Sequence, residues 1–171
     1  QIILQDGIKS QVEIEKNKAI LIGDDFSNKE ILKKALAKRK NLEKKFKNQN
    51  STNKPLLLIQ VPDKNSKGSL ENLMDEILEI LATEKITKEN KKLAIYLSEE
   101  KTNIVGDDNQ PLESVQVLIF KQAIALGWDC PRAQILVIFR DMKSFTFETQ
   151  TIGRITRFPD PQAGYFLDSE L

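Results

Sequence analysis

Two short apolar runs decide the fold: Val117-Leu118-Ile119-Phe120 and Ile135-Leu136-Val137-Ile138-Phe139. Neither run alternates with polar residues. A short continuous apolar run is typical of a strand that is buried on both faces of a parallel sheet. Leu56–Val61 has the same character, and Leu93–Leu97 is the next predicted strand along the chain. These runs predict a core of buried, mainly parallel strands.

Two amphipathic segments lie among these strands. Apolar residues recur at helical spacing from about Asn28 to Lys47 and again from Ser69 to Leu81, where Ser69 can cap the helix. Strands that alternate with helices are joined by right-handed crossovers. The pattern therefore predicts an α/β fold with three layers, in which helices cover both faces of the sheet.

The first fifty residues differ in character from the rest. Ile2–Leu4, Val12–Glu15 and Ala19–Ile22 predict short strands separated by turns, and thus a small β-hairpin or meander. The basic helix follows, and the polar loop Asn48–Asn53 is the predicted boundary. We expect residues 1–50 to form a hairpin-plus-helix appendage and residues 51–171 to form the main domain.

The helix from Asn28 to Lys47 carries nine basic side chains between positions 29 and 47. One interpretation is a solvated, lysine-rich face. The other is a surface that contacts DNA phosphates, because clustered Lys and Arg supply the sequence-independent part of DNA affinity. The predicted contacts are Lys33, Lys34, Lys38, Arg39, Lys44 and Lys45.

Composition excludes several kinds of site. The 171-residue chain has a formal net charge of +1, one cysteine and no histidine, so no internal disulfide and no histidine-based catalysis are available. No apolar run approaches the roughly 20 residues that span a bilayer. We expect a cytoplasmic protein without a membrane partner. The chain begins with Gln, which suggests a fragment of a longer protein.

Four residues that follow the second decisive run share one helical face. Gln150, Gly153, Arg154 and Arg157 are spaced i, i+3, i+4 and i+7. Two arginines and an amide beside a glycine suit a polyanion such as a triphosphate. A pair of surface arginines bonded to nearby carboxylates is the simpler alternative.

These residues carry a resemblance to a known family. Gln150-x-x-Gly153-Arg154-x-x-Arg157 resembles the last conserved motif of superfamily-two helicases, and Gly127-Trp128-Asp129-Cys130-Pro131 resembles the motif before it. The stretch from about Pro55 to Phe158 is most similar to the restriction (Res) subunit of type III restriction-modification enzymes. The resemblance implies the second RecA-like domain of an ATP-driven DNA translocase. Gln150 departs from the histidine that many of these helicases have at this position.

The resemblance also implies roles for individual residues. Arg154 and Arg157 would reach across an interdomain cleft to the γ-phosphate of ATP and act in catalysis. Gln150, Gly153, Gly127 and Asp129 would lie at the same ATP site. Lys121 stands where many relatives have a small hydroxyl residue that contacts the nucleic-acid backbone.

The implied partners are duplex DNA, the first RecA-like domain and the nuclease domain of the same chain, and a DNA-methyltransferase subunit. ATP and Mg²⁺ would be held mainly by the first domain, because this chain contains no Gly-x-x-x-x-Gly-Lys-Ser/Thr sequence and no acidic pair after a suitable strand. We expect no metal ligands in this chain, and no activity from the chain alone.

Two other interpretations were considered. Asp63 with Glu99 and Lys101 imitates the carboxylate–lysine pattern of a restriction nuclease, but the gap is long and Glu-x-Lys is common in a chain rich in Lys and Glu. The alternative to the motor is a catalytically silent α/β module that binds nucleic acid or protein.

Overall fold

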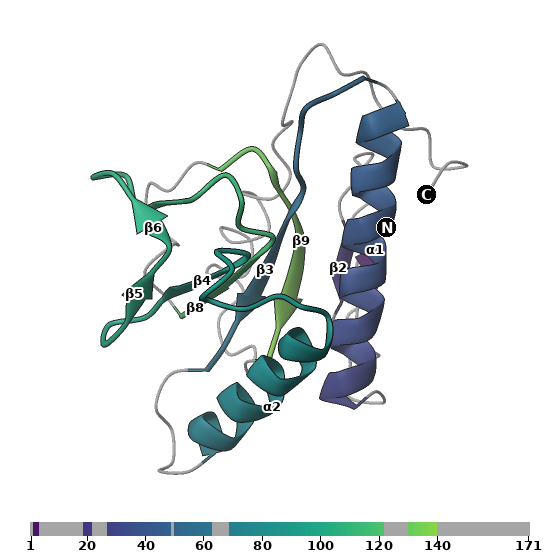
Figure 1. Ribbon diagram of the computed structural model, residues 1–171. Helices are drawn as coiled ribbons and strands as arrows, with labels where there is room; N and C mark the ends of the chain where they lie inside the picture. The colour runs from purple at the N-terminus through teal and green to yellow at the C-terminus, as the bar shows by residue number, and fades with distance from the viewer. Residues whose placement is uncertain are drawn as a thin grey trace.

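The computed structural model describes residues 2–3, 19–21, 27–48, 50–62, 69–121 and 130–139. Within these residues the chain forms an α/β fold built on one large sheet (Figure 1). The elements, in chain order, are β1 (Ile2–Ile3), β2 (Ala19–Leu21), α1 (Asn28–Asn48), β3 (Leu56–Gln60), α2 (Ser69–Thr83), β4 (Leu93–Tyr96), β5 (Lys101–Thr102), β6 (Ile104–Val105), β7 (Gln110–Pro111), β8 (Val117–Phe120) and β9 (Ala133–Ile138).

The large sheet has seven strands in the order β1-β2-β9-β3-β8-β4-β5, and all its neighbours pair in parallel except β4 and β5. The two decisive runs form β8 and β9, which lie on either side of β3. A register shift between Leu56 and Leu57 leaves Gln134 of β9 without a partner on β3. The prediction of a mainly parallel sheet is confirmed.

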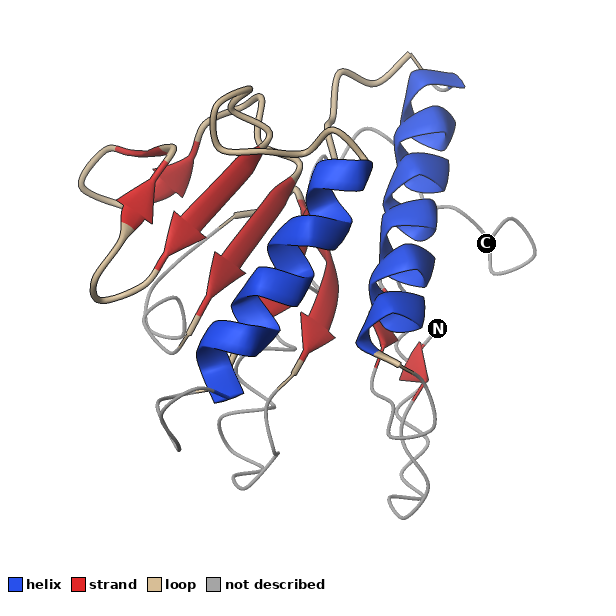
Figure 2. Ribbon diagram, turned by 60° about the horizontal axis from the view of Figure 1, so that its bottom comes forward, coloured by secondary structure: helices blue, strands red, loops and turns tan. Residues whose placement is uncertain are grey.

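Both long helices lie over the same face of the sheet (Figure 2). Helix α1 begins with a capping box, in which the backbone amide of Ser27 donates to the Glu30 carboxylate at 2.9 Å and the Glu30 amide donates to the Ser27 hydroxyl at 3.3 Å. The Ser27 hydroxyl also donates to the Glu30 carboxylate at 2.8 Å, and this bond, together with the one from the Ser27 amide, holds the pKa of Glu30 below its ordinary value. The apolar stripes of α1 and α2 join Leu57, Ile59 and the inward-facing residues of the other strands in one core.

The second face of the sheet is also buried. Its core includes Leu58, Leu118, Phe120 and Leu136, each at most 2% exposed. The small β6–β7 hairpin adds Ile104 to this side. Among the described residues no helix lies over this second face, so the predicted third layer of helices stays a prediction.

The pairing at the start of the chain was not predicted. β1 and β2 pair in parallel, and β2 extends the large sheet by pairing with β9. The predicted strand Val12–Glu15, which a hairpin with either of these strands would need, lies outside the described residues, so the hairpin or meander stays a prediction. Helix α1 packs into the core that β3, β8 and β9 also form, and the boundary after residue 50 stays a prediction.

The sequence pattern predicts no strand between Leu97 and Val117, where the structure has β5, β6 and β7. Each has two residues, which is too short to show a periodic pattern. The tip of the β6–β7 hairpin contains Gly106 at a φ of +72°, a left-handed conformation that glycine adopts without strain. No helix among the described residues is long and apolar enough to cross a membrane.

Arg132, which lies just before β9, connects several segments of the chain by hydrogen bonds. Its guanidinium donates to the carbonyl oxygens of Leu112 and Val115, each at 2.8 Å, with longer contacts to those of Pro111 at 3.4 Å and Lys54 at 3.5 Å. Burial lowers the pKa of Arg132, and interactions with Cys130 and Glu113 partly offset this effect. The side chain stays charged at neutral pH because an arginine is not deprotonated in proteins.

We expect Arg132→Met to lower the free energy of unfolding by about 2–3 kcal/mol, because it leaves the Leu112 and Val115 carbonyls without their charged donor. Urea unfolding followed by circular dichroism measures the change. Arg132→Lys should recover only part of the loss, since an ammonium group lacks the planar fork.

Lys54→Met is the matched control, because it removes an exposed cation that pairs with Glu113 at 3.3 Å. This variant should lose less than about 0.5 kcal/mol. If Arg132→Met and the unmodified chain have equal unfolding free energies, the guanidinium does not stabilise the fold.

Candidate functional site

β3 and β8 are neighbours in the sheet, and the chain continues from them in opposite directions across it. After β3 the chain passes through α2 to β4, which lies toward the β5 edge of the sheet. After β8 it continues to β9, which lies on the other side of β3, toward the β1 edge. In open parallel sheets, ligands bind beyond the carboxyl ends of the strands at such a reversal. We call the carboxyl ends of β3 and β8 the switch point, and it is the candidate functional site.

Gln60 lies at the carboxyl end of β3, between Phe120 of β8 and Ile138 of β9. Backbone bonds hold this end together: the Val61 amide donates to the Phe120 carbonyl at 2.9 Å, and the Phe139 amide donates to the Gln60 carbonyl at 2.9 Å. Gln60 is only 2% exposed, and its Nε2 atom has no hydrogen-bond acceptor among the residues that the structure describes. A buried amide donor without an acceptor is uncommon in folded proteins. It is a polar feature of the switch point that the sequence analysis missed.

Lys121, which follows β8, was predicted to contact DNA. Its Nζ atom lies 3.7 Å from Oε2 of Glu99, and its side chain is 12% exposed against 55% for Glu99. A phosphate would therefore have to compete with the Glu99 carboxylate for a mostly buried ammonium group. This arrangement weakens the case for Lys121 as a DNA contact, and that role stays a prediction.

The predicted ATP-site residues lie outside the described residues. They are Gly127, Asp129, Gln150, Gly153, Arg154 and Arg157. Cys130, in the first of the two motifs, is described and buried, with 5% exposure.

The nuclease-like pattern finds no support in the residues that the structure describes. Glu100 pairs with Lys88 at 3.0 Å and accepts a bond from the Thr102 hydroxyl at 3.0 Å. Lys101 lies over the Tyr96 ring, with its Nζ atom 4.6 Å from the ring centroid. Asp63 is outside the described residues. Across the described ranges, no group of three or more acidic or cysteine side chains could hold a metal ion.

The six basic residues predicted as one DNA-contacting face of α1 differ in exposure. Lys33, Lys34 and Lys44 are exposed, while Lys38 and Lys45 are half-buried. Burial lowers the pKa of Lys38, and the nearby Lys45 charge lowers it further. Because only three of the five lysines are fully exposed, the side chains predicted as one face do not form a uniform phosphate-binding surface.

The prediction that Arg39 contacts DNA is corrected by the structure, because the side chain faces the core. It is 3% exposed, its Nη2 atom bonds Glu43 at 3.2 Å, and its Nη1 atom donates to the Pro55 carbonyl at 3.5 Å. Burial lowers its pKa, and the Glu43 charge opposes that shift. Arg39 connects α1 to the chain just before β3 and is not placed to contact DNA.

We expect Arg39→Met to reduce stability without a specific effect on DNA affinity. The loss should be about 1–3 kcal/mol, because Glu43 loses its bond to the buried guanidinium and keeps only the exposed Lys47 as a charged partner. Urea unfolding gives the stability, and fluorescence anisotropy with labelled duplex gives the affinity of the folded chain. Exposed Lys44→Met is the matched control and should leave stability within about 0.5 kcal/mol. If Arg39→Met is as stable as the unmodified chain but binds duplex more weakly, Arg39 contacts DNA after all.

The chain matches no family model, no curated protein and no solved structure. Any assignment of function therefore depends on its own residues and on the order of its strands.

Proposed function

We propose that this chain is the second RecA-like domain of a superfamily-two DNA translocase of the type III restriction class. In this proposal it works in the cytoplasm on duplex DNA, beside a first RecA-like domain and a nuclease domain of the same protein. A DNA-methyltransferase subunit would be the further partner. The domain would supply arginines to an ATP site that two domains share.

The observation that carries the proposal is the pair of motifs on either side of β9. Gly127–Pro131 precedes this strand and Gln150–Arg157 follows it. β9 lies beside β3 in the centre of a parallel sheet, as a RecA-like α/β domain requires. Each motif alone is common, whereas the two in this order around a buried parallel strand are much more specific.

Arginine suits the role proposed for Arg154 and Arg157. Its guanidinium stays charged, and its planar fork can bond two phosphate oxygens at once. A cation delivered across a cleft stabilises the charge on the transferring phosphoryl group. Gln150 would donate from a neutral amide beside these arginines.

The described residues do not fit a complete ATP and Mg²⁺ site. They provide no cluster of metal-binding carboxylates, and the sequence contains no phosphate-binding loop of the Walker type. The proposal therefore places the phosphate cradle and the metal ligands in the first RecA-like domain. Mg²⁺ bound there would neutralise charge on the phosphates.

The chain by itself should hydrolyse no ATP above background, because the phosphate cradle is absent from its sequence. A coupled phosphate-release assay with purified chain tests this. Sustained release over many turnovers, by a preparation free of contaminating ATPase, would show that the chain has a complete site and would overturn the shared-site proposal.

In the full-length motor, Arg157→Ala should lower kcat far more than it raises the KM for ATP. The interaction is proposed to strengthen as charge develops in the transition state, which is the pattern of a lost transition-state contact. The expected loss in kcat is on the order of 10³-fold, or about 4 kcal/mol. Arg157→Lys should recover part of it, because the charge remains but the fork is lost.

Steady-state ATPase kinetics on the two variants, with circular dichroism to confirm folding, measure these effects. Arg132→Lys is a useful control, since it changes a structural arginine that donates to backbone carbonyls of this domain. A folded Arg157→Ala enzyme with the unmodified kcat would favour the alternative function, a catalytically silent α/β module that binds nucleic acid or protein.

A further inference from the structure

The helix layer carries its charges unevenly along its length. Helices α1 and α2 run side by side: Asn28 at the start of α1 donates to Glu76 in the middle of α2 at 2.9 Å, and Lys40 in the second half of α1 pairs with Glu84 just beyond the end of α2 at 2.6 Å. Because each helix precedes a parallel strand, both end at the edge of the sheet where the strands begin. Over its first three turns α2 presents acidic residues: Glu71, Asp75, Glu76 and Glu79.

The opposite end of the layer is basic. We call it the lysine end, and it consists of the last turns of α1, the residue before Pro55 and the turn between α2 and β4. Its lysines are Lys40, Lys44, Lys47, Lys54, Lys85, Lys88, Lys91 and Lys92. The carboxylates in the same segments and beside them are Glu43, Glu84, Glu89, Glu100 and Glu113. The lysine end therefore has an excess of positive charge, although the whole chain has a net charge of only +1.

The lysine end includes cations that form no ion pair with another described residue. Lys44, Lys85 and Lys91 are exposed and have no such carboxylate partner, whereas Lys40 and Lys47 pair with Glu84 and Glu43. Exposed pairs of this kind are worth little, so a polyanion can displace them. The cations that could bind a polyanion therefore come from two segments, the end of α1 and the turn between α2 and β4, and not from one face of a single helix.

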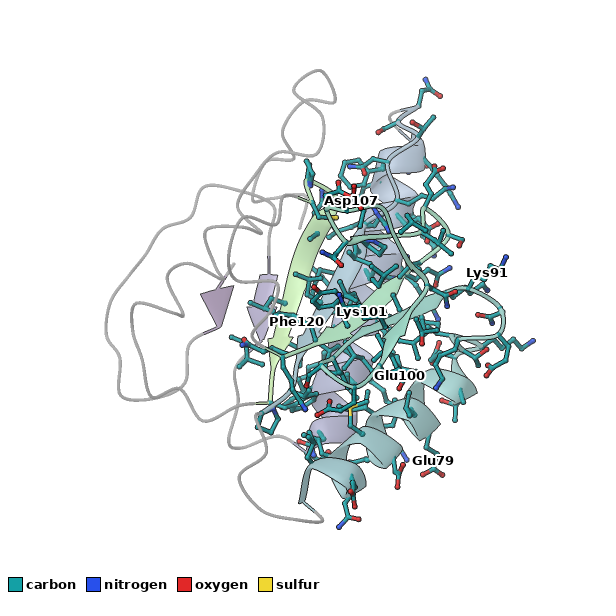
Figure 3. All side chains as sticks on the ribbon, turned by 90° about the vertical axis from the view of Figure 1, so that its left-hand side faces the viewer. Glu79, Lys91, Glu100, Lys101, Asp107 and Phe120 are labelled. Atoms are coloured by element: carbon teal, nitrogen blue, oxygen red, sulfur yellow. The ribbon has the colours of Figure 1, made fainter. Side chains whose placement is uncertain are left out.

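The turn between α2 and β4 holds its lysines on a fixed backbone. Lys85 and Lys91 have φ values of +57° and +59°, a conformation that is uncommon for residues other than glycine. The Asn90 side-chain amide donates to the Lys85 carbonyl at 2.8 Å, and the Lys91 amide donates to the Lys88 carbonyl at 3.1 Å. Figure 3 shows Lys91 projecting away from the sheet. The turn therefore presents its cations from defined positions.

We propose that the lysine end binds the phosphate backbone of duplex DNA without reading its sequence. The choice of DNA as the polyanion rests on the proposed function, while the surface itself follows from the charge distribution. This surface lies at the edge where the strands begin, opposite the switch point, so it is a second and separate contact. The acidic beginning of α2 would repel phosphates and so favour DNA at the basic end.

The side chains of this surface favour a duplex backbone over a single strand. Single-stranded nucleic acid is normally held by exposed aromatic rings on which bases stack. Among the described residues the only exposed large apolar side chain is Val105, which belongs to the β6–β7 hairpin and not to the lysine end. Flexible lysines without aromatic neighbours bind phosphates as point charges.

The test compares two variants of the chain that change the net charge equally. Lys44→Glu, Lys85→Glu and Lys91→Glu reverse three exposed cations of the lysine end. The control combines Lys29→Glu, Lys101→Glu, Asn72→Asp and Ser98→Asp, all at exposed positions outside the lysine end. Fluorescence anisotropy with a labelled duplex of random sequence gives Kd over a range of NaCl concentrations, and thermal melts confirm folding.

The unmodified chain should bind duplex weakly, with an affinity that falls as salt rises. The lysine-end variant should bind at least about tenfold more weakly, and the slope of log Kd against log salt should decrease by about 2–3, near one unit for each lost phosphate contact. The control should change Kd by less than about threefold, because it keeps these contacts. Tighter binding to a single strand than to duplex, no duplex binding by the unmodified chain, or equal losses in both variants would each overturn the proposal.

Failure of this inference can be distinguished from failure of the proposed function. The binding assay contains no ATP and does not depend on Arg154 or Arg157. Loss of duplex binding in the lysine-end variant alone, together with a fully active Arg157→Ala motor, would leave a DNA-binding module without the proposed ATP site. If instead the lysine-end variant binds duplex as well as the unmodified chain and Arg157→Ala inactivates the motor, the proposed function stands and the second DNA contact is refuted.

Discussion

The structure depends on three central strands, β9, β3 and β8, whose side chains are buried on both faces and whose backbones bond on both edges. A strand in that position cannot satisfy its amide and carbonyl groups with water, so its neighbours and register are strongly constrained. Parallel pairing then requires every connection to return across the sheet, which places α1 and α2 in one layer over β3 and its neighbours. It also brings the ends of β3 and β8 together at one edge. The candidate site is therefore a consequence of how the core is paired.

Much of the core could be predicted from the sequence because burial on both faces leaves a simple pattern. The runs at Leu56, Leu93 and Val117 begin the strands β3, β4 and β8, and both helices lie where their apolar stripes predict. The parallel pairing of β1 with β2 could not be predicted, because two short apolar segments separated by turn residues resemble a hairpin until their partners are known. The position of Gln134 at a register shift also depends on how β9 pairs with β3, and the local sequence does not predict it.

The candidate site was predicted less completely, and Arg39 shows why. Charge alone placed it with the lysines, yet it lies four residues after Ala35 and three before Leu42, within the buried stripe of α1. Helical spacing could have identified it as a core residue whose charge is balanced by Glu43 four residues later. Gln60 carried a comparable signal, as the one polar residue in the apolar run of β3. Lys121 carried none, because its partner Glu99 comes from a separate loop and is adjacent only in the folded chain.

The two ends of the sheet differ in how completely their charges are balanced. At the switch point Lys121 is paired with Glu99, so that cation adds little to the local electrostatic field.

At the lysine end, part of the positive charge has a structural reason. Cations in the last turn of a helix interact favourably with the helix dipole and stabilise the helix by about 0.3–1 kcal/mol each. Lys47 occupies that position on α1. The dipole effect is confined to the last turn, however, and Lys91 lies well beyond the end of α2 at Thr83. Helix stability thus accounts for some of these lysines, and the remaining positive charge is what a phosphate backbone would neutralise.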